Sequence, residues 1–528
     1  MNSHKNVITM ISVMVFIGLL MFVTVSILTG GGNSIGNLFR YTIPVIAIYG
    51  FARPRHAIYM LFLTSPFWDQ VKRFMIFDLR LAEFDLALIL AVSPILMASI
   101  FLRTFFDCAF TPTQENKKTL IAMIVTGILV VLFILVSSSS GGRTSGIRGF
   151  GQGVNAGIYF FLIPILPRYF QTRMEYAKLL GILTVVYMIP ALWCIKQGIW
   201  GLAGYELDYV KYGLSGEIRQ LAEKKFRNPG TMQGAAAMSC AASIFLALTL
   251  MPVIMKTGKF RLISIFYPQR IILVLLFGTC MYYTYSRTPW SAIVTALICF
   301  TCLRVKFLSH LVLVSSIIGM FALYLSAEKI FDEKLLNKWQ VALIKKYGGD
   351  AGVEQTLVLG TINARMESMA NLVNGRDHVL QPFGVKVAKI MGSTHDFQYI
   401  KQHDMVTEYV VKFGYIPCFF GFLFGIWIAL KVIHLNFRLT PSPELNSARV
   451  YASLFVGTQI IGFSHGATLS TFPLNLFIVF LLASSIHHYK LARQIHKLAT
   501  EEQPVNDPVA SAQAPTNRFP SQRPYRTA

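Results

Sequence analysis

Residues 119–138 read TLIAMIVTGILVVLFILVSS, an apolar run without a charged side chain. A helix needs about 20 such residues to cross a bilayer, so this run predicts a transmembrane helix. Comparable runs recur along the chain and predict an all-α fold, a polytopic transmembrane helical bundle of about 12–14 spans. The candidate spans are 7–29, 38–51, 56–68, 82–102, 119–138, 153–170, 177–196, 231–254, 269–286, 289–303, 308–326, 409–433, 449–465 and 471–488.

The composition argues against a soluble protein. Of the 528 residues, 54% are hydrophobic and 14% are charged, and the mean hydropathy is +0.53. Soluble domains carry about 25% charged residues. Most Lys and Arg side chains behind the net charge of +23 lie in short segments between apolar runs, the pattern that orients membrane proteins. Orientation and attraction to anionic lipid headgroups account for this basicity, so no nucleic-acid partner is expected.

The distribution of basic residues also predicts which side each loop faces. If Lys5 is cytoplasmic, every loop expected inside contains Lys or Arg, beginning with Arg53 and Arg55. The run 56–68 is short for a span, but omitting it would place all later basic clusters outside. Both termini are therefore predicted to be cytoplasmic. The principal outer loops are 139–152, 197–230, Ser286–Pro289 and 327–408.

The predicted organisation is a transmembrane domain over 1–488 and a disordered cytoplasmic tail over 489–528, which is rich in Pro, Gln, Ala and Arg. The first apolar run is too long for a signal peptide and is interpreted as a span. The seven cysteines lie in or beside apolar runs, so a disulfide framework is not expected. Cys299 and Cys302 form a C-x-x-C spacing, but within a predicted membrane helix, where helix packing explains it better than redox chemistry.

The outer loop 327–408 is large enough to contain short helices. Apolar residues recur at helical spacing from Glu333 to Tyr347, which predicts a helix on the membrane surface or packed against the spans. A second helix is predicted from Thr361 to Leu372, because this stretch contains good helix formers and neither Gly nor Pro. The polar stretch from this second helix to Gly414 contains four of the candidate functional residues, namely Arg365, His395, His403 and Asp404.

Two arginines in the outer segments are candidates for binding an anion. Arg287 follows Ser286 at the outer end of the span 269–286. It either extends its charge to the membrane interface or provides a fixed cation facing a cavity, and we expect the latter. Arg365 would lie on the same side. Two guanidinium groups can bind a pyrophosphate through paired hydrogen bonds and stabilise a departing charge.

Further basic side chains in the outer loops are weaker candidates for the same ligand. Arg143 and Arg148 lie in the Ser- and Gly-rich loop 139–152, which could close over an anion or serve only as a connector. Arg219 precedes the predicted turn Asn228-Pro229-Gly230. His465 lies between the last two spans, where a loop cap and a cavity lining are both open interpretations.

The sequence offers a candidate general base just before the span 409–433. His403 has an unperturbed pKa near the working pH, and Asp404 or Glu408 could orient it. The alternative is a polar cap at the mouth of the span. His395, followed by Asp396, competes for the role of base. Two His-Asp pairs in one loop do not have the spacing of a metal site, so no metal and no cofactor are predicted.

These segments together resemble the O-antigen ligase and O-antigen polymerase family of bacterial envelope glycosyltransferases. Ser286-Arg287 is similar to the family's Ser-Arg pair at the outer end of a span. Asn363-Ala364-Arg365 and the following segment 380–385 resemble its loop Arg and Pro-x-x-Gly stretch. His403-Asp404 through Gly414 resembles its His-Asn motif, and 226–229 resembles its Asn-Pro segment. The likeness is strongest over 226–430.

The sequence departs from the family pattern at three places. Asp404 stands where the family has Asn. Glu408 comes earlier than the family's Glu, whose position is taken by Lys412. The Pro-x-x-Gly stretch lacks its second Gly, because Lys386 follows Val385.

The resemblance implies a metal-independent transfer of glycan units on the periplasmic face of the bacterial inner membrane. The donor would be a glycan on undecaprenyl pyrophosphate, and the acceptor another glycan or a lipid core. Arg287 and Arg365 would hold the pyrophosphate, and His403 would deprotonate the acceptor hydroxyl. Other polysaccharide-assembly proteins are candidate partners.

Two alternatives remain open at this stage. Within the glycosyltransferase class, the sequence does not choose between a polymerase and a ligase. From another class, a transporter or flippase for the same lipid-linked oligosaccharide would use inverted repeats and charges near the bilayer midplane. Neither is evident here, and the charges gather at the outer ends of the spans, which favours the enzyme.

Overall fold

The structure is a computed structural model in which the chain is all-helical wherever it is described. It describes residues 34–77, 83–111, 113–137, 146–211, 228–232, 234–251, 267–286, 288–330, 369–370, 372–374, 380–384, 405–465 and 472–501. The predicted span 7–29 and the predicted helix over 333–347 lie outside these residues. Of the predicted second loop helix, only 369–370 and 372 are described, and they are helical.

Six described helices contain a segment long and apolar enough to cross a membrane. They are α5 (Glu83–Phe110), α6 (Gln114–Ser137), α9 (Arg173–Trp200), α14 (Lys306–Ile330), α19 (Tyr415–Arg438) and α21 (Leu474–Glu501). Shorter apolar segments occur in α2 (Ser34–Ala52), α11 (Ala235–Leu250), α12 (Tyr267–Tyr283) and α13 (Thr288–Cys302). The other helices are α3 (Pro54–Thr64), α4 (Trp68–Phe77), α7 (Gly146–Gly157), α8 (Leu162–Tyr169), α10 (Gly204–Lys211), α18 (Met405–Phe413) and α20 (Pro443–His465), with 3-10 turns η1 (Ser65–Phe67) and η2 (Ile158–Phe161).

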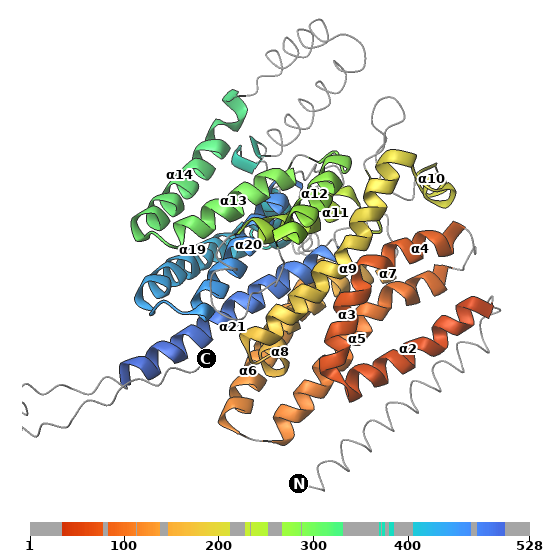
Figure 1. Cartoon of the computed structure of the whole chain (residues 1–528), viewed down its shortest axis with the longest axis horizontal. Helices are drawn as coiled ribbons and strands as arrows, with labels where there is room; N and C mark the ends of the chain where they lie inside the picture. The colour runs from red at the N-terminus through yellow and green to blue at the C-terminus, as the bar shows by residue number, and fades with distance from the viewer. Residues whose placement is uncertain are drawn as a thin grey trace, which may run out of the picture.

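The helices form a bundle with α11 and α21 inside it and α6, α14 and α19 at its edges (Figure 1). In the most apolar window of α21, 78% of the residues are buried, against 6% in α19. The exposed residues of α19 are large and apolar, among them Phe420, Phe424 and Trp427. A helix that is apolar around its whole circumference and exposed in the monomer is suited to contact with lipid.

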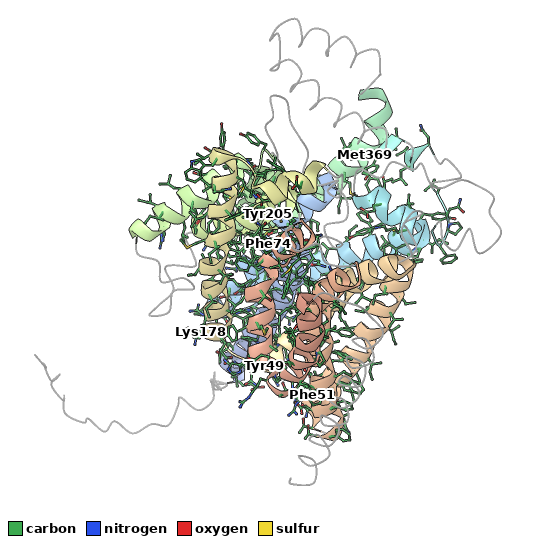
Figure 2. All side chains as sticks on the ribbon, turned by 90° about the vertical axis from the view of Figure 1, so that its right-hand side faces the viewer. Tyr49, Phe51, Phe74, Lys178, Tyr205 and Met369 are labelled. Atoms are coloured by element: carbon green, nitrogen blue, oxygen red, sulfur yellow. The ribbon has the colours of Figure 1, made fainter. Side chains whose placement is uncertain are left out.

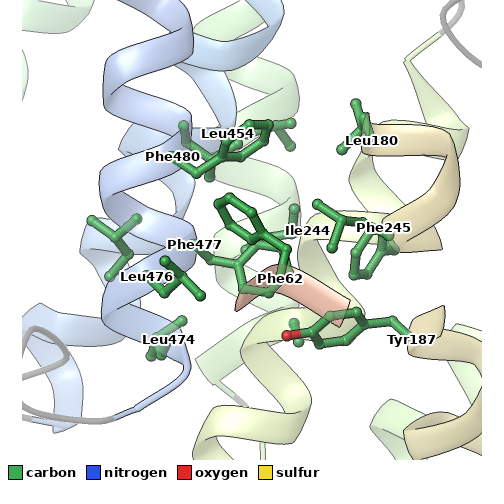
Figure 3. Packing of buried hydrophobic residues seen from close by; sticks show 14 of the residues in the cluster. Phe62, Leu180, Tyr187, Ile244, Phe245, Leu454, Leu474, Leu476, Phe477 and Phe480 are labelled. Atoms are coloured by element: carbon green, nitrogen blue, oxygen red, sulfur yellow. The ribbon is translucent and has the colours of Figure 1, made fainter. Parts of the chain in front are cut away.

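The core is built from aromatic rings contributed by helices far apart in the sequence (Figure 3). Phe62 of α3 lies between α9 and α21, with its ring centroid 5.2 Å from that of Phe480. Tyr187 of α9 contacts Phe245 at 5.1 Å and Phe477 at 4.8 Å. These edge-to-face and tilted contacts fix the relative positions of α3, α9, α11 and α21.

The two ends of the bundle differ in chemistry (Figure 2). Tyr49, Phe51 and Lys178 lie toward one end, which we call the basic end, and Phe74, Tyr205 and Met369 lie toward the other, which we call the loop end. Two contacts of arginine side chains lie at the basic end. Arg55 donates to Glu175 at 2.7 Å, and the Arg103 guanidinium lies 5.7 Å from the centre of the Phe51 ring.

Several predicted element boundaries are corrected by the structure. The run 56–68 is divided into α3, η1 and the start of α4, and the run 153–170 into α7, η2 and α8. Pro66 lies in η1, where proline removes a helical hydrogen bond. The span predicted over 409–433 is interrupted at Gly414, between α18 and α19.

Two segments predicted to be irregular are helical. Helix α21 continues to Glu501, so residues 489–501 are not part of a disordered tail. Tyr489 and Ala492 explain the extension, because both are buried against Leu445 and Ala448 of α20. Helix α7 begins at Gly146, so the end of the predicted flexible loop 139–152 is helical. Gly153 allows α7 to lie against the backbone of Ile134 in α6.

Candidate functional site

Most of the predicted site residues lie outside the part of the chain that the structure describes. Ser286 is described and buried, and Arg148 is placed by its backbone in α7. The residues outside the described ranges are Arg143, Arg219, Arg287, Arg365, His395, His403 and Asp404. The site is therefore built from the described segments on either side of these residues.

The first such segment is the corner that follows α12, which comprises residues 284–286. Helix α12 ends at Tyr283, and the backbone N–H of Tyr285 donates to the Tyr282 carbonyl at 3.1 Å. Tyr285 has φ of 49°, the only positive φ of a non-glycine residue in the described ranges. The left-handed conformation costs an aromatic residue about 1–2 kcal/mol, so the surrounding contacts must hold it. Ser286 follows directly, 7% exposed.

A buried turn over residues 228–232, which we call the Asn-Pro-Gly turn, lies beside this corner. Gln197 of α9 binds both backbone groups of Gly230: its side-chain oxygen accepts from the N–H at 2.8 Å, and its side-chain nitrogen donates to the carbonyl at 3.2 Å. Arg73 of α4 donates to the carbonyls of Gly230, at 3.4 Å, and Met232. Thr231 donates to the Pro66 carbonyl at 2.7 Å.

A fully buried carboxylate, that of Glu206, holds the Gln197 side chain that binds the Asn-Pro-Gly turn. Glu206 of α10 accepts from Gln197 at 2.7 Å, from the Trp193 indole at 3.2 Å and from the backbone N–H of Ala203 at 2.8 Å. Gln70 of α4 also donates to it, at 3.3 Å. Burial of a carboxylate is tolerated when donors surround it in this way.

The sequence reasoning missed this network. Arg73 is 1% exposed and Glu206 is fully buried, and neither was singled out from the sequence. Next to Arg73 in the sequence, Lys72 forms a salt bridge with Asp69 at 3.3 Å. One sequence feature could have indicated the buried network. Gln197 lies within the apolar helix α9, and a buried Gln needs a polar partner.

The Asn-Pro-Gly turn is joined to the corner by a side-chain hydrogen bond. The Asn228 amide nitrogen donates to the Tyr283 carbonyl at 2.8 Å. The Cys194 thiol donates to the Asn228 carbonyl at 3.5 Å. Two sequence stretches that resemble motifs of one family are therefore adjacent at the loop end of the structure.

The second group of segments surrounds α18. Residues 380–384, which include Pro382-Phe383-Gly384, lie against the break between α18 and α19. The backbone N–H groups of Tyr415 and Ile416 donate to the carbonyls of Gln381 at 3.0 Å and Pro382 at 3.2 Å. We call this contact the Pro-Phe-Gly interlock.

The interlock depends on two glycines. Gly384 has φ of 85° and Gly414 has φ of 92°, conformations that L-residues rarely adopt. A Cβ atom on Gly384 would overlap the Lys412 carbonyl, and one on Gly414 would overlap the Pro382 carbonyl. Both glycines are therefore required by the close approach of the two backbones as well as by φ.

Helix α18 carries a largely buried ion pair. Glu408 and Lys412 are four residues apart and form a salt bridge on one face of the helix. Lys412 occupies the position at which the resembled family has Glu, and Glu408 neutralises it within the same helix. The pair stabilises the helix that immediately follows His403-Asp404 in the sequence.

A small apolar cluster connects the large loop to α14 and α18. Met369 packs with Tyr324 of α14, and Val406 of α18 packs against the same cluster. In the sequence, Met369 comes four residues after Arg365, and Val406 comes three residues after His403. The described ends of these two loop segments therefore meet at one place.

Helix α20 joins the two groups of segments. Gly457 of α20 lies against Ala292 and Ala296 of α13, close to the corner. Helix α18 packs against α20 and α6, with the Phe413 ring 5.7 Å from that of Phe133. The corner and α18 thus have α20, which ends at His465, as a common neighbour.

No group of three His, Cys, Asp or Glu residues in the described ranges is arranged to hold a metal ion. The loop end contains polar and charged side chains such as Glu408 and Lys412. The neighbouring helix α19 has an exposed apolar surface. Comparisons of the chain with protein-family models, with curated proteins and with solved structures found no match.

Proposed function

We propose that the protein is an inner-membrane glycosyltransferase that transfers or polymerises glycan units carried on undecaprenyl pyrophosphate. The observation that carries this proposal is the Pro-Phe-Gly interlock. It joins the loop stretch 380–384 to the helix that follows His403-Asp404. A resemblance read from separate motifs would have little weight if those motifs were far apart in the fold.

The loop end is the periplasmic end in this proposal, and the basic end is cytoplasmic. The separation of Lys178 from Met369 along the bundle supports this orientation, because basic residues are retained on the cytoplasmic side (Figure 2). Both termini then lie in the cytoplasm. The shorter apolar helices α2, α11, α12 and α13 would cross the membrane as well, which brings the proposed spans among the described residues to ten.

The proposed reaction is a direct displacement at the anomeric carbon of the donor sugar. The acceptor hydroxyl oxygen forms a bond to this carbon while the bond from the carbon to the pyrophosphate oxygen breaks. His403 takes the proton of the hydroxyl, with Asp404 orienting the imidazole. Arg287 and Arg365 bind the leaving pyrophosphate and stabilise its charge. Ser286, which precedes Arg287 in the sequence, is proposed as a further contact to the donor.

The remaining candidate residues are proposed to bind the substrates. Arg143, Arg148 and Arg219 are proposed as additional contacts to the anionic donor, and His395 as a contact to the acceptor. The apolar exteriors of α6, α14 and α19 provide surfaces along which a polyprenyl chain can remain in the bilayer.

Purified protein in detergent tests the proposal directly. Given a carrier-linked donor and an acceptor, the wild-type protein should form a glycosidic product, and Arg287→Ala and His403→Ala should each lose at least about 100-fold in rate. Lys178→Ala, at the basic end, is the matched control for loss of a positive charge and should retain the rate. Equal product formation by all four proteins would contradict the proposal.

The same assay separates an enzyme from a transporter, because detergent micelles offer no second compartment. Product formation in detergent excludes transport as the sole activity. Supplying either a carrier-linked glycan or a lipid core as the acceptor then separates a polymerase from a ligase.

A further inference from the structure

The end of α12 depends on a hydrogen bond from outside the helix. The last carbonyls of a helix have no partner within it. At Tyr283 this partner is the side chain of Asn228, which is 3% exposed and donates at 2.8 Å. The chain then turns through the left-handed Tyr285 to Ser286, and Arg287 is the next residue in the sequence.

The same helix end is also held closely by α9. A Cβ atom on Gly198 would overlap the ring of Tyr283, so the ring occupies the space that a side chain would otherwise fill. The Cys194 thiol reaches the Cys280 carbonyl at 3.7 Å. The last turn of α12 therefore has little freedom to shift.

Asn228 is itself fixed by the network that holds its turn. Gln197 binds both backbone groups of Gly230, two residues further on, and Glu206 holds Gln197 in place. The chain of contacts runs from α10 through α9 and the turn to the carbonyl of Tyr283. Buried hydrogen bonds of this kind have a defined geometry because no water competes for the groups.

We propose that Asn228 is a positioning residue for the proposed glycosyl transfer, acting through the corner that contains Ser286 and precedes Arg287. Its amide binds the Tyr283 carbonyl at the end of α12 and thereby fixes the backbone that leads, four residues later in the sequence, to Arg287. The inference rests on the proposed function, in which Arg287 binds that group. Asn228 itself does not contact the reacting atoms.

If Asn228 only stabilises the fold, its replacement and the replacement of Arg287 should have independent effects on activity. If Asn228 positions Arg287, the two effects should depend on each other. Loss of one hydrogen bond that only stabilises the fold lowers activity equally whether or not Arg287 is present. Loss of a bond that orients Arg287 has little effect once the guanidinium is gone. Residues that act as a unit are recognised by this non-additivity.

The test is a double-mutant cycle with Asn228→Ala and Arg287→Lys, measured as kcat/KM for the carrier-linked donor in detergent. Asn228→Ala should lower this value about 100-fold in the wild-type background, the loss expected when a catalytic group is displaced by about 1 Å. In the Arg287→Lys background, the further loss should be no more than about threefold. Affinity for undecaprenyl pyrophosphate, measured on the same four proteins, gives a second cycle that needs no turnover.

Asn116→Ala is the matched control at the basic end. The Asn116 amide also donates to a carbonyl just beyond a helix end, that of Thr111 at 2.6 Å. This variant should lose stability as Asn228→Ala does and retain kcat/KM. Additive effects of Asn228→Ala and Arg287→Lys in both cycles would overturn the positioning role while leaving the proposed function intact. Absence of turnover in the wild-type protein would instead overturn the proposed function.

Discussion

Replacement of Gly384 by Ala disturbs the Pro-Phe-Gly interlock at one defined point. The added Cβ would overlap the Lys412 carbonyl, and this backbone atom cannot rotate away as a side chain would. Ala also disfavours the φ of 85° by about 1–2 kcal/mol. If residues 380–384 move away from the break between α18 and α19, the overlap and the backbone strain are both relieved. This movement breaks two backbone hydrogen bonds, each worth about 0.5–1.5 kcal/mol.

Undocking of residues 380–384 therefore costs about 1–3 kcal/mol for the two lost hydrogen bonds, which opens the interlock without unfolding a bundle of this size. We expect Gly384→Ala to leave the melting temperature within about 3 °C of the wild-type value. The rate of glycosyl transfer should fall about 100-fold, because the helix following His403 is no longer held against the large loop. Limited proteolysis near the turn should become faster.

Gly421→Ala and Gly425→Ala are the matched controls. Both glycines lie within α19, and a Cβ atom at either position would have no neighbour within 4 Å. Ala is favoured over Gly in a helix, so neither substitution should lower stability or transfer rate. A Gly384→Ala protein with full turnover and unchanged proteolysis would refute the reasoning, because the interlock would then have no role in the site.

Three further substitutions test the packing. Gly198→Ala should lower the unfolding free energy by about 1–3 kcal/mol, since the added methyl group meets the Tyr283 ring, and thermal unfolding in detergent measures this loss. Lys412→Met should lower the unfolding free energy by about 1–3 kcal/mol, because it removes the salt bridge to the largely buried Glu408 carboxylate, and adding Glu408→Gln should restore part of the loss. Phe477→Ala should cost about 3–5 kcal/mol because it opens a cavity in the aromatic core, and an unchanged melting temperature would contradict the core assignment.

Much of the fold could be predicted from the lengths of the apolar runs. The run 119–138 corresponds to α6 at Gln114–Ser137, and the predicted break Ser286–Pro289 overlaps the end of the interval between α12 and α13, although α13 already begins at Thr288. Helix interiors in a bilayer have an almost purely apolar composition, so periodicity and length suffice to find them. The break at Gly414 was not predicted, because it arises from the approach of the distant residues 380–384.

The candidate site was less predictable for the same reason. The sequence identified the stretches near Ser286, Pro382 and Asn228, because turn-forming residues interrupt the apolar pattern there. It did not identify Glu206 or Gln197, whose importance lies in contacts with α4 and with the Asn-Pro-Gly turn. Such long-range pairing of polar groups has no local sequence signature.

Proximity of the three proposed catalytic and binding side chains is the central claim, and cross-linking measures it most directly. Arg287→Cys, Arg365→Cys and His403→Cys would be combined in pairs in a protein from which the seven natural cysteines have been removed. The purified proteins would then be treated with thiol-specific cross-linkers of increasing length. We predict that all three pairs are joined by the shortest reagents. Failure of any pair to react except with the longest reagents would contradict a single site at the loop end.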